Sequence, residues 1–358
     1  MKYINDYLTW RGDLTFAQDK LNEVDALIFS LLSYAGLDDI FQVDKISMSE
    51  LANMYDESSI TKQGVIFKEV SPLLKVIASK ERYKDVTVSD YVNILDKENT
   101  IQFTAVTFHL PDNTAVVSFM GTDSTVTGWK EDFKFSAGVT NGQKESVRYL
   151  NNLFKNNDEK IITAGHSKGA NFAVYSASFS DSNIRNRIEK VYSFDGPGLP
   201  EILKEEENYK SMQNKIIRIV PDQSMIGMIF SESNEDIIVH SDTFLIFQHD
   251  PFSWEIEGNK FISKELSQFS VYFREILASW LSKMDDDDRN FFVDTIFSYF
   301  ENTGADTFAQ MRKSLWTTVS KMLQTQKEMD EDNKKEMSKL LSLLFESAFK
   351  IVTENIKK

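Results

Sequence analysis

The segment Gly165-His166-Ser167-Lys168-Gly169 has the spacing of a G-x-S-x-G motif, which holds a serine hydroxyl out on a sharp turn. A short apolar run at residues 161–164 precedes it, and a helix is predicted at residues 168–180. Glycine on either side leaves room for a strained serine backbone, and the helix N-terminus beneath the serine favours developing negative charge. The segment therefore predicts that Ser167 attacks a carbonyl group. The alternative is an ordinary tight turn between a strand and a helix.

The elements that position this serine alternate along the chain. The first hundred residues are predicted to be mainly helical, and the pattern changes at about residue 101. Two runs rich in β-branched and aromatic residues, 101–110 and 114–120, flank Pro111-Asp112-Asn113 and predict a hairpin. Beyond the hairpin, predicted helices alternate with predicted buried strands: helices at 146–154 and 168–180, strands at 160–164, 191–194, 215–220 and 237–247. This order predicts an α/β fold with a mostly parallel central sheet.

The strands stop at about residue 264. From there on, four amphipathic helices are predicted, at residues 266–284, 291–300, 308–323 and 337–356. We therefore divide the chain into an α/β domain, residues 1–263, and a helical C-terminal extension, residues 264–358. The extension is large enough to offer a surface for a homo-oligomer.

Composition narrows the classes of function. The 358 residues include no cysteine, so disulfides and thiolate metal sites are excluded, and no other metal or organic cofactor is implied. The net charge of -15 opposes contact with phosphate backbones, so nucleic-acid binding is not expected. The N-terminus lacks the apolar run of a signal peptide, and no stretch has the roughly 20 apolar residues that span a bilayer. We therefore expect a cytoplasmic protein without a transmembrane segment.

Three segments in order resemble the class 3 lipases, a branch of the α/β-hydrolases. Val117-Ser118-Phe119-Met120-Gly121-Thr122-Asp123, with Gly128-Trp129-Lys130-Glu131-Asp132 after it, resembles their Phe-Arg-Gly-Thr strand end and Asp-Trp element. Residues 161–169 resemble their Gly-His-Ser-Leu-Gly elbow, and Tyr192-Ser193-Phe194-Asp195-Gly196-Pro197 resembles the strand and proline loop that follow. The resemblance implies an α/β-hydrolase fold with a serine, acid and histidine triad. Met120 departs from it, because it stands where these lipases usually have arginine.

A closer resemblance is to an uncharacterised bacterial family of lipase-like proteins. That family has a Gly-His-Ser-Lys-Gly elbow and two further motifs, present here as Asp195-Gly196-Pro197-Gly198 and Gln248-His249-Asp250-Pro251-Phe252-Ser253-Trp254. The similarity extends from the N-terminus to about residue 260 and beyond.

The order serine, acid, histidine in α/β-hydrolases restricts the base to the two histidines that follow the elbow, His240 and His249. His240 lies inside a β-rich run, where ladder hydrogen bonds hold a residue in place. His249 comes at the end of that run, and Pro251 cannot continue a central strand. We therefore predict His249 as the base, with His240 as the alternative.

Two aspartates directly follow predicted strands, where α/β sheets place their chemistry. Asp222 follows the strand at 215–220, and Asp195 follows the strand before it. We predict Asp222 as the triad acid and keep Asp195 as the alternative. Either could instead cap a turn or helix.

The oxyanion of acyl transfer needs two backbone N–H donors. The N–H of Lys168 follows the nucleophile, and the resemblance implies Thr122 for the second. Together these residues predict a serine hydrolase that cleaves carboxylic esters of a small molecule or lipid through an acyl-enzyme. Two alternatives stay open: a catalytically idle hydrolase fold that serves as a binding module, and an acyltransferase or peptidase with the same triad.

Overall fold

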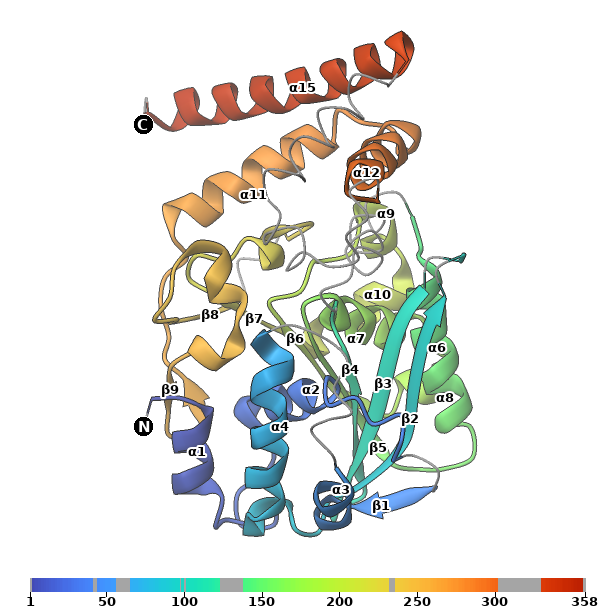
Figure 1. The fold of residues 1–358 in the computed structure, drawn as a ribbon, viewed down its shortest axis with the longest axis vertical. Coiled ribbons are helices and arrows are strands. Elements are labelled where there is room, and N and C mark those ends of the chain that lie inside the picture. The colour runs from blue at the N-terminus through green and yellow to red at the C-terminus, as the bar shows by residue number, and fades with distance from the viewer. Residues whose placement is uncertain are drawn as a thin grey trace.

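The computed structural model describes residues 2–40, 44–55, 65–96, 98–99, 101–122, 138–231, 236–301 and 330–356. Its centre is an eight-stranded sheet whose strands lie side by side in chain order (Figure 1). The strands are β1 (Lys45–Ser47), β2 (Thr87–Asp96), β3 (Ile101–Leu110), β4 (Thr114–Phe119), β5 (Lys160–His166), β6 (Ile188–Phe194), β7 (Ile216–Pro221) and β8 (Ile237–Val239). Strands β1 to β4 pair antiparallel, and β4 to β8 pair parallel.

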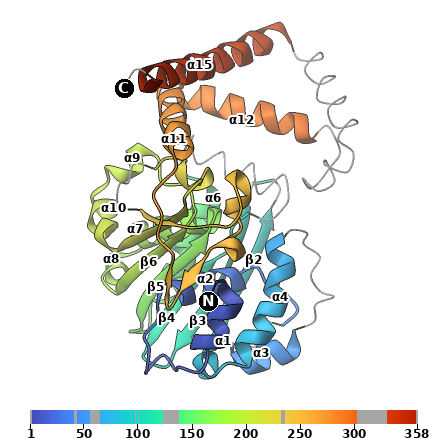
Figure 2. The same ribbon diagram turned by 90° about the vertical axis from the view of Figure 1, so that its left-hand side faces the viewer.

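Helices cover both faces of the sheet (Figure 2). One face carries α1 (Ile4–Arg11), α2 (Glu23–Leu32), α3 (Met48–Met54) and α4 (Val65–Ala78). The other carries α6 (Asn141–Leu153), α7 (Lys168–Phe179), α8 (Ser182–Arg185), α9 (Glu201–Lys204) and α10 (Glu207–Met212). Side chains along a strand alternate between the two faces of the sheet. In β4, Val116 packs toward α2, while its neighbours Ala115 and Val117 pack toward α7. A mostly parallel sheet between two helical layers is the α/β-hydrolase architecture predicted from the sequence.

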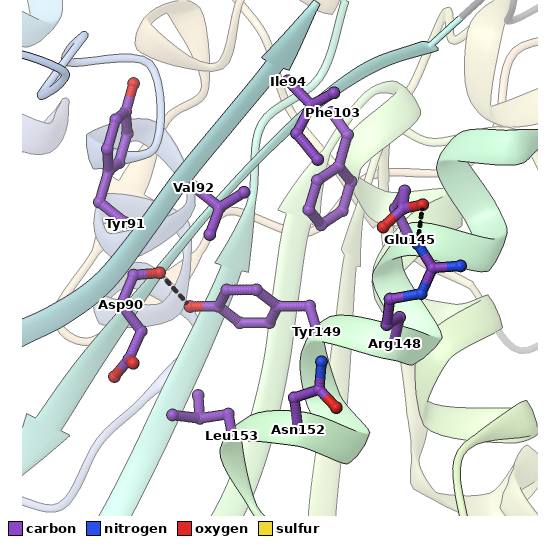
Figure 3. A pocket seen from close by; sticks show the side chains of 10 residues that line it. All are labelled: Asp90, Tyr91, Val92, Ile94, Phe103, Glu145, Arg148, Tyr149, Asn152 and Leu153. Carbon is purple, nitrogen blue, oxygen red and sulfur yellow. Dashed lines mark hydrogen bonds and ion pairs between the residues drawn. The ribbon is translucent and has the colours of Figure 1, made fainter. Parts of the chain in front are cut away.

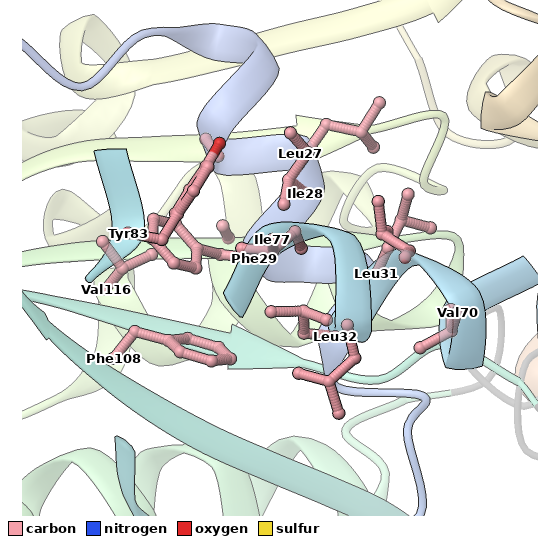
Figure 4. Close-up of a cluster of buried hydrophobic side chains, with 14 of the residues drawn as sticks. Leu27, Ile28, Phe29, Leu31, Leu32, Val70, Ile77, Tyr83, Phe108 and Val116 are labelled. Carbon is pink, nitrogen blue, oxygen red and sulfur yellow. The ribbon is translucent and has the colours of Figure 1, made fainter. Parts of the chain in front are cut away.

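The core under the N-terminal helices fixes α2 against the sheet (Figure 4). Asn22 caps α2 by accepting hydrogen bonds from the backbone of Val24 and Asp25. The rings of Phe29 and Phe108 lie 4.8 Å apart between their centroids. Apolar side chains of α2, α4 and β4 fill the space around them: Leu27, Ile28, Leu31, Leu32, Val70, Ile77 and Val116.

The predicted hairpin is confirmed as β3 and β4, and the predicted alternation from residue 146 to 220 is confirmed as α6, β5, α7, β6 and β7. One expectation is extended by the structure, and one is corrected. The first hundred residues also contain β1 and β2, and a bulge between Ser89 and Val92 breaks the alternating pattern that would have revealed β2. The last predicted strand, 237–247, ends at Val239, because the His240 N–H donates to the Ile262 carbonyl and not to β7. A 3₁₀ turn then forms at Leu245–His249, where Leu245 has a φ of 50°.

The C-terminal extension contains α11 (Gln268–Leu281), α12 (Asp286–Glu301) and α15 (Glu331–Ile356). They pack on one another through Trp280, Met284 and Leu340, and the Trp280 indole donates to the Leu340 carbonyl at 3.0 Å. The predicted helix at residues 308–323 lies outside the described residues. Among the helices of the described ranges, none has the length and apolarity required to cross a bilayer.

Candidate active site

The elbow between β5 and α7 holds Ser167 in a strained conformation. Its backbone angles, a φ of 59° and a ψ of −130°, are values that residues other than glycine rarely adopt. Gly165 and Gly169 make this turn sterically possible: a Cβ at Gly165 would overlap the Gly169 carbonyl, and a Cβ at Gly169 would overlap the Phe119 carbonyl of β4. Ser167 is 8% exposed, and its own N–H donates to the Phe194 carbonyl of β6 at 3.0 Å.

His249 lies against this serine. Its Nε2 is 2.9 Å from the Ser167 Oγ. The residue ends the 3₁₀ turn η6 (Leu245–His249), and η7 (Pro251–Ser253) follows after Asp250. Two buried side chains bind the backbone at this point. The Trp254 indole donates to the Gln248 carbonyl at 2.8 Å, and His166 Nε2 donates to the His249 carbonyl at 2.9 Å. The imidazole is therefore positioned by the buried core.

The carboxylate that contacts His249 belongs to Asp195, at the end of β6. Its Oδ2 is 2.6 Å from His249 Nδ1, while its Oδ1 accepts hydrogen bonds from the Ser224 hydroxyl at 2.5 Å and the Gly227 N–H at 3.1 Å. Burial raises the pKa of the Asp195 carboxyl, but the hydrogen bonds from His249 and Ser224 lower that pKa below its ordinary value. An ionised Asp195 accepts the Nδ1–H of His249, which leaves Nε2 free to accept the serine proton.

The sequence predicts Asp222 as the acid beside His249, and the structure places Asp195 there instead. Asp222 Oδ1 instead accepts a hydrogen bond from Gln248 Nε2 at 3.3 Å. The sheet order explains the difference: β6, which leads to Asp195, is the immediate neighbour of the elbow strand, whereas β7, which leads to Asp222, lies one strand further away. Asp222 thus supports the segment that carries His249 and does not touch its ring.

His240, the alternative base, is held elsewhere. Its backbone N–H donates to the Ile262 carbonyl at 2.8 Å, and its carbonyl accepts from the Glu255 N–H at 2.9 Å. Its ring faces the carboxylates of Glu255 and Asp222, at 3.7 Å and 3.8 Å. The structure therefore brings His249, and not His240, to Ser167.

Of the two predicted oxyanion donors, Lys168 directly follows the serine, and Thr122 directly follows Gly121, a residue close to the serine. Lys168 begins α7, and its buried ammonium group donates to the Gln102 carbonyl at 3.1 Å. Thr122 follows Gly121, where an added Cβ would lie 3.0 Å from the Ser167 Cβ. The end of β4 is thus in contact with the elbow, as an oxyanion site requires.

Comparison with known proteins identifies the family. The model of the Mbeg1-like family matches residues 77–298, which is well over half of the chain. The chain belongs to the Mbeg1-like family. A search of curated proteins finds no match.

One solved structure similar to this Mbeg1-like chain is described as the crystal structure of M37 lipase. It is 16% identical, with a TM-score of 0.38, over 58% of this chain and 70% of that one. The fold assignment rests on the chain's own strand order, its helical layers and the elbow at Ser167.

Two residues of the Mbeg1-like site were not anticipated as parts of it. His166 is fully buried, its ring centroid 4.5 Å from that of His249, and Tyr34 of the N-terminal region lies 3.3 Å from its Nδ1. The Tyr34 hydroxyl also accepts from the Gly121 N–H at 3.0 Å, so it joins the elbow to the end of β4. The position of His166 within the motif was a usable signal, whereas nothing in the local sequence marks Tyr34.

The buried His166 predicts a specific dependence of stability on pH. Burial, and secondarily the nearby His249, lower the pKa of His166 from 6.5 to about 3. Below pH 6.5 the unfolded chain takes up a proton that the folded chain refuses, so the unfolded state gains stability as pH falls toward 3. We expect this residue to reduce the free energy of unfolding by about 1.4 kcal/mol per pH unit in that window.

The variant His166→Gln keeps a donor for the His249 carbonyl and removes the titrating group. Urea unfolding between pH 6.5 and 4.5 should therefore show a shallower loss of stability than in the wild type. Equal slopes for the two proteins would contradict the buried, neutral state of His166.

A cavity of about 500 Å³ lies apart from this site, between β2, β3 and α6 (Figure 3). Apolar side chains and the aromatic rings of Phe103 and Tyr149 line most of it, and Glu145 pairs with Arg148 at its edge. The Tyr149 hydroxyl donates to the Asp90 carbonyl at 2.6 Å. None of its lining residues belongs to the group around Ser167.

A second serine–histidine–carboxylate chain occurs near the opposite end of the central strands, beside the start of β5. His109 Nε2 is 2.7 Å from the Ser89 Oγ, and its Nδ1 is 2.6 Å from the Glu159 carboxylate. The Ser89 hydroxyl also donates to the Asp90 carboxylate, so its proton is directed away from the imidazole. This group ties β2 and β3 to the start of β5, and Ser89 provides a matched control for Ser167.

Proposed function

We propose that this Mbeg1-like protein is a serine hydrolase that cleaves carboxylic esters through an acyl-enzyme. One observation carries the proposal: a strained Ser167 whose hydroxyl is 2.9 Å from His249, with the opposite ring nitrogen 2.6 Å from a buried Asp195. A nucleophile, a base and an orienting acid in this sequence of contacts are what acyl transfer requires.

In the first step, the Ser167 Oγ attacks the ester carbonyl carbon while His249 Nε2 takes its proton. Asp195 holds the imidazole in the tautomer that can accept this proton and stabilises the imidazolium. The tetrahedral intermediate collapses when His249 returns the proton to the departing alkoxide, which leaves the acyl group on Ser167. Water then attacks the acyl-enzyme, with His249 as base again, and releases the carboxylic acid.

The negative charge that develops on the carbonyl oxygen is assigned to two backbone donors. The Lys168 N–H belongs to the first turn of α7, where the helix dipole also favours negative charge. The Thr122 N–H belongs to the segment after β4, where Gly121 approaches the elbow closely.

Hydrolysis of p-nitrophenyl acetate by purified protein tests the proposal. The wild type should show saturable turnover, and Ser167→Ala should lower kcat by about 10⁶-fold, to the background. The matched variant Ser89→Ala, which removes the other histidine-linked serine, should retain turnover. A folded wild type without turnover would favour the binding module, and faster transfer to an added amine or alcohol than to water would favour an acyltransferase.

A further inference from the structure

The turn that delivers His249 carries four consecutive large apolar side chains on its surface. Phe244 is 62% exposed, Leu245 40%, Ile246 43% and Phe247 61%. The rings of Phe244 and Phe247 lie edge to face, with centroids 5.4 Å apart. We call residues 244–247 the apolar turn. A contiguous apolar surface of this kind is typical of an interaction site.

Hydrogen bonds from neighbouring residues hold the apolar turn in this exposed form. Leu245 has a φ of 50°, and its N–H donates to the Gln223 side chain at 3.0 Å. The buried Gln248 accepts from the Gln223 N–H at 2.7 Å and donates to the Thr243 carbonyl at 3.0 Å and to Asp222. A strained backbone persists only where its surroundings fix it, so the outward direction of these side chains is built into the fold.

The chemistry of the surroundings selects the partner. Asp242 and Asp250 flank the segment; Lys2 Nζ lies 3.9 Å from the Asp242 carboxylate, and the chain as a whole carries a net charge of -15. An anionic surface would be repelled, whereas an uncharged or zwitterionic one can accept the four apolar side chains. A partner that presents acyl chains there also presents ester groups beside His249, which lies two residues beyond Phe247.

We propose that the apolar turn docks the protein on a zwitterionic lipid surface, so that the esters delivered to Ser167 are those of amphiphiles in that surface. The docking step needs no catalysis, while the assignment of the substrate class rests on the proposed function. Because η6 ends at His249, the residues that would contact the lipid and the base of the triad belong to one short segment.

Co-sedimentation of the full chain with phosphatidylcholine vesicles tests the docking. The double variant Phe244→Ser/Phe247→Ser should lower the partition coefficient by about tenfold or more. The control is Phe345→Ser/Phe349→Ser, which removes two phenylalanines of α15 that are 71% and 74% exposed and should leave partitioning unchanged. Thermal unfolding of each variant verifies that it is folded.

Equal losses for the two pairs, no sedimentation of the wild type, or stronger binding to phosphatidylglycerol vesicles would each overturn the proposal. So would a dimer of the wild type that the Phe244/Phe247 variant dissociates. Ser167→Ala should sediment like the wild type. Vesicle binding without any ester hydrolysis would then refute the proposed function alone, and hydrolysis of soluble esters without vesicle binding would refute the docking alone.

Discussion

Replacement of His249 by alanine is expected to lower kcat for ester hydrolysis by about 10⁴- to 10⁶-fold. The Ser167 hydroxyl is a weak nucleophile until a base takes its proton, and His249 Nε2 is the group 2.9 Å from it. The loss should appear in kcat, because the imidazole acts in the transition state and contributes little to binding of the ester in the ground state. Steady-state kinetics with a soluble p-nitrophenyl ester would measure it.

The matched control is His240→Ala. The backbone of His240 is hydrogen-bonded to Ile262 and Glu255, which keeps the residue away from Ser167. Alanine removes only the ring, which faces carboxylates, so the change should affect stability more than turnover. Near-normal turnover by folded His249→Ala together with loss in His240→Ala would reverse the assignment.

Asp195→Asn is expected to lower kcat by about 10⁴-fold while the protein remains folded. The ionised carboxylate accepts the Nδ1–H of His249 at 2.6 Å and so keeps Nε2 available to the serine. An amide at this position can present its NH₂ group to Nδ1, which favours the tautomer with the proton on Nε2 and blocks the base.

The corresponding change Asp222→Asn separates the two aspartates that sequence analysis left as alternatives. Its side chain keeps an oxygen that can accept from Gln248 Nε2, so turnover should stay close to that of the wild type. A large loss in Asp222→Asn with little effect in Asp195→Asn would restore Asp222 as the acid and contradict the observed geometry.

The elbow and the hairpin could be predicted because their signals are local. Gly165 and Gly169 are required by contacts within the turn and with the adjacent strand, and Pro111-Asp112-Asn113 marks a tight turn wherever it occurs. The alternation of strands and helices predicted from residue 146 to 220 likewise follows from short-range apolar patterns.

The choice between Asp195 and Asp222 depends on information that local patterns do not contain. Both follow a buried strand, and only the order of β5, β6 and β7 in the sheet brings Asp195 to the base. The contact of Tyr34 with His166 joins residues 132 positions apart, so no spacing rule could reveal it. Long-range placement, more than residue type, determined which side chains form the site.

Labelling with a fluorophosphonate, followed by mass mapping of the modified peptide, tests the central claim most directly. The reagent modifies a serine only when a base activates it, so it reports the nucleophile without knowledge of the natural ester. Our account predicts one adduct on the peptide that contains Ser167, and none on that peptide in Ser167→Ala or, at the same exposure, in His249→Ala. A correctly folded wild type that stays unlabelled, or one whose adduct maps to another serine, would contradict it.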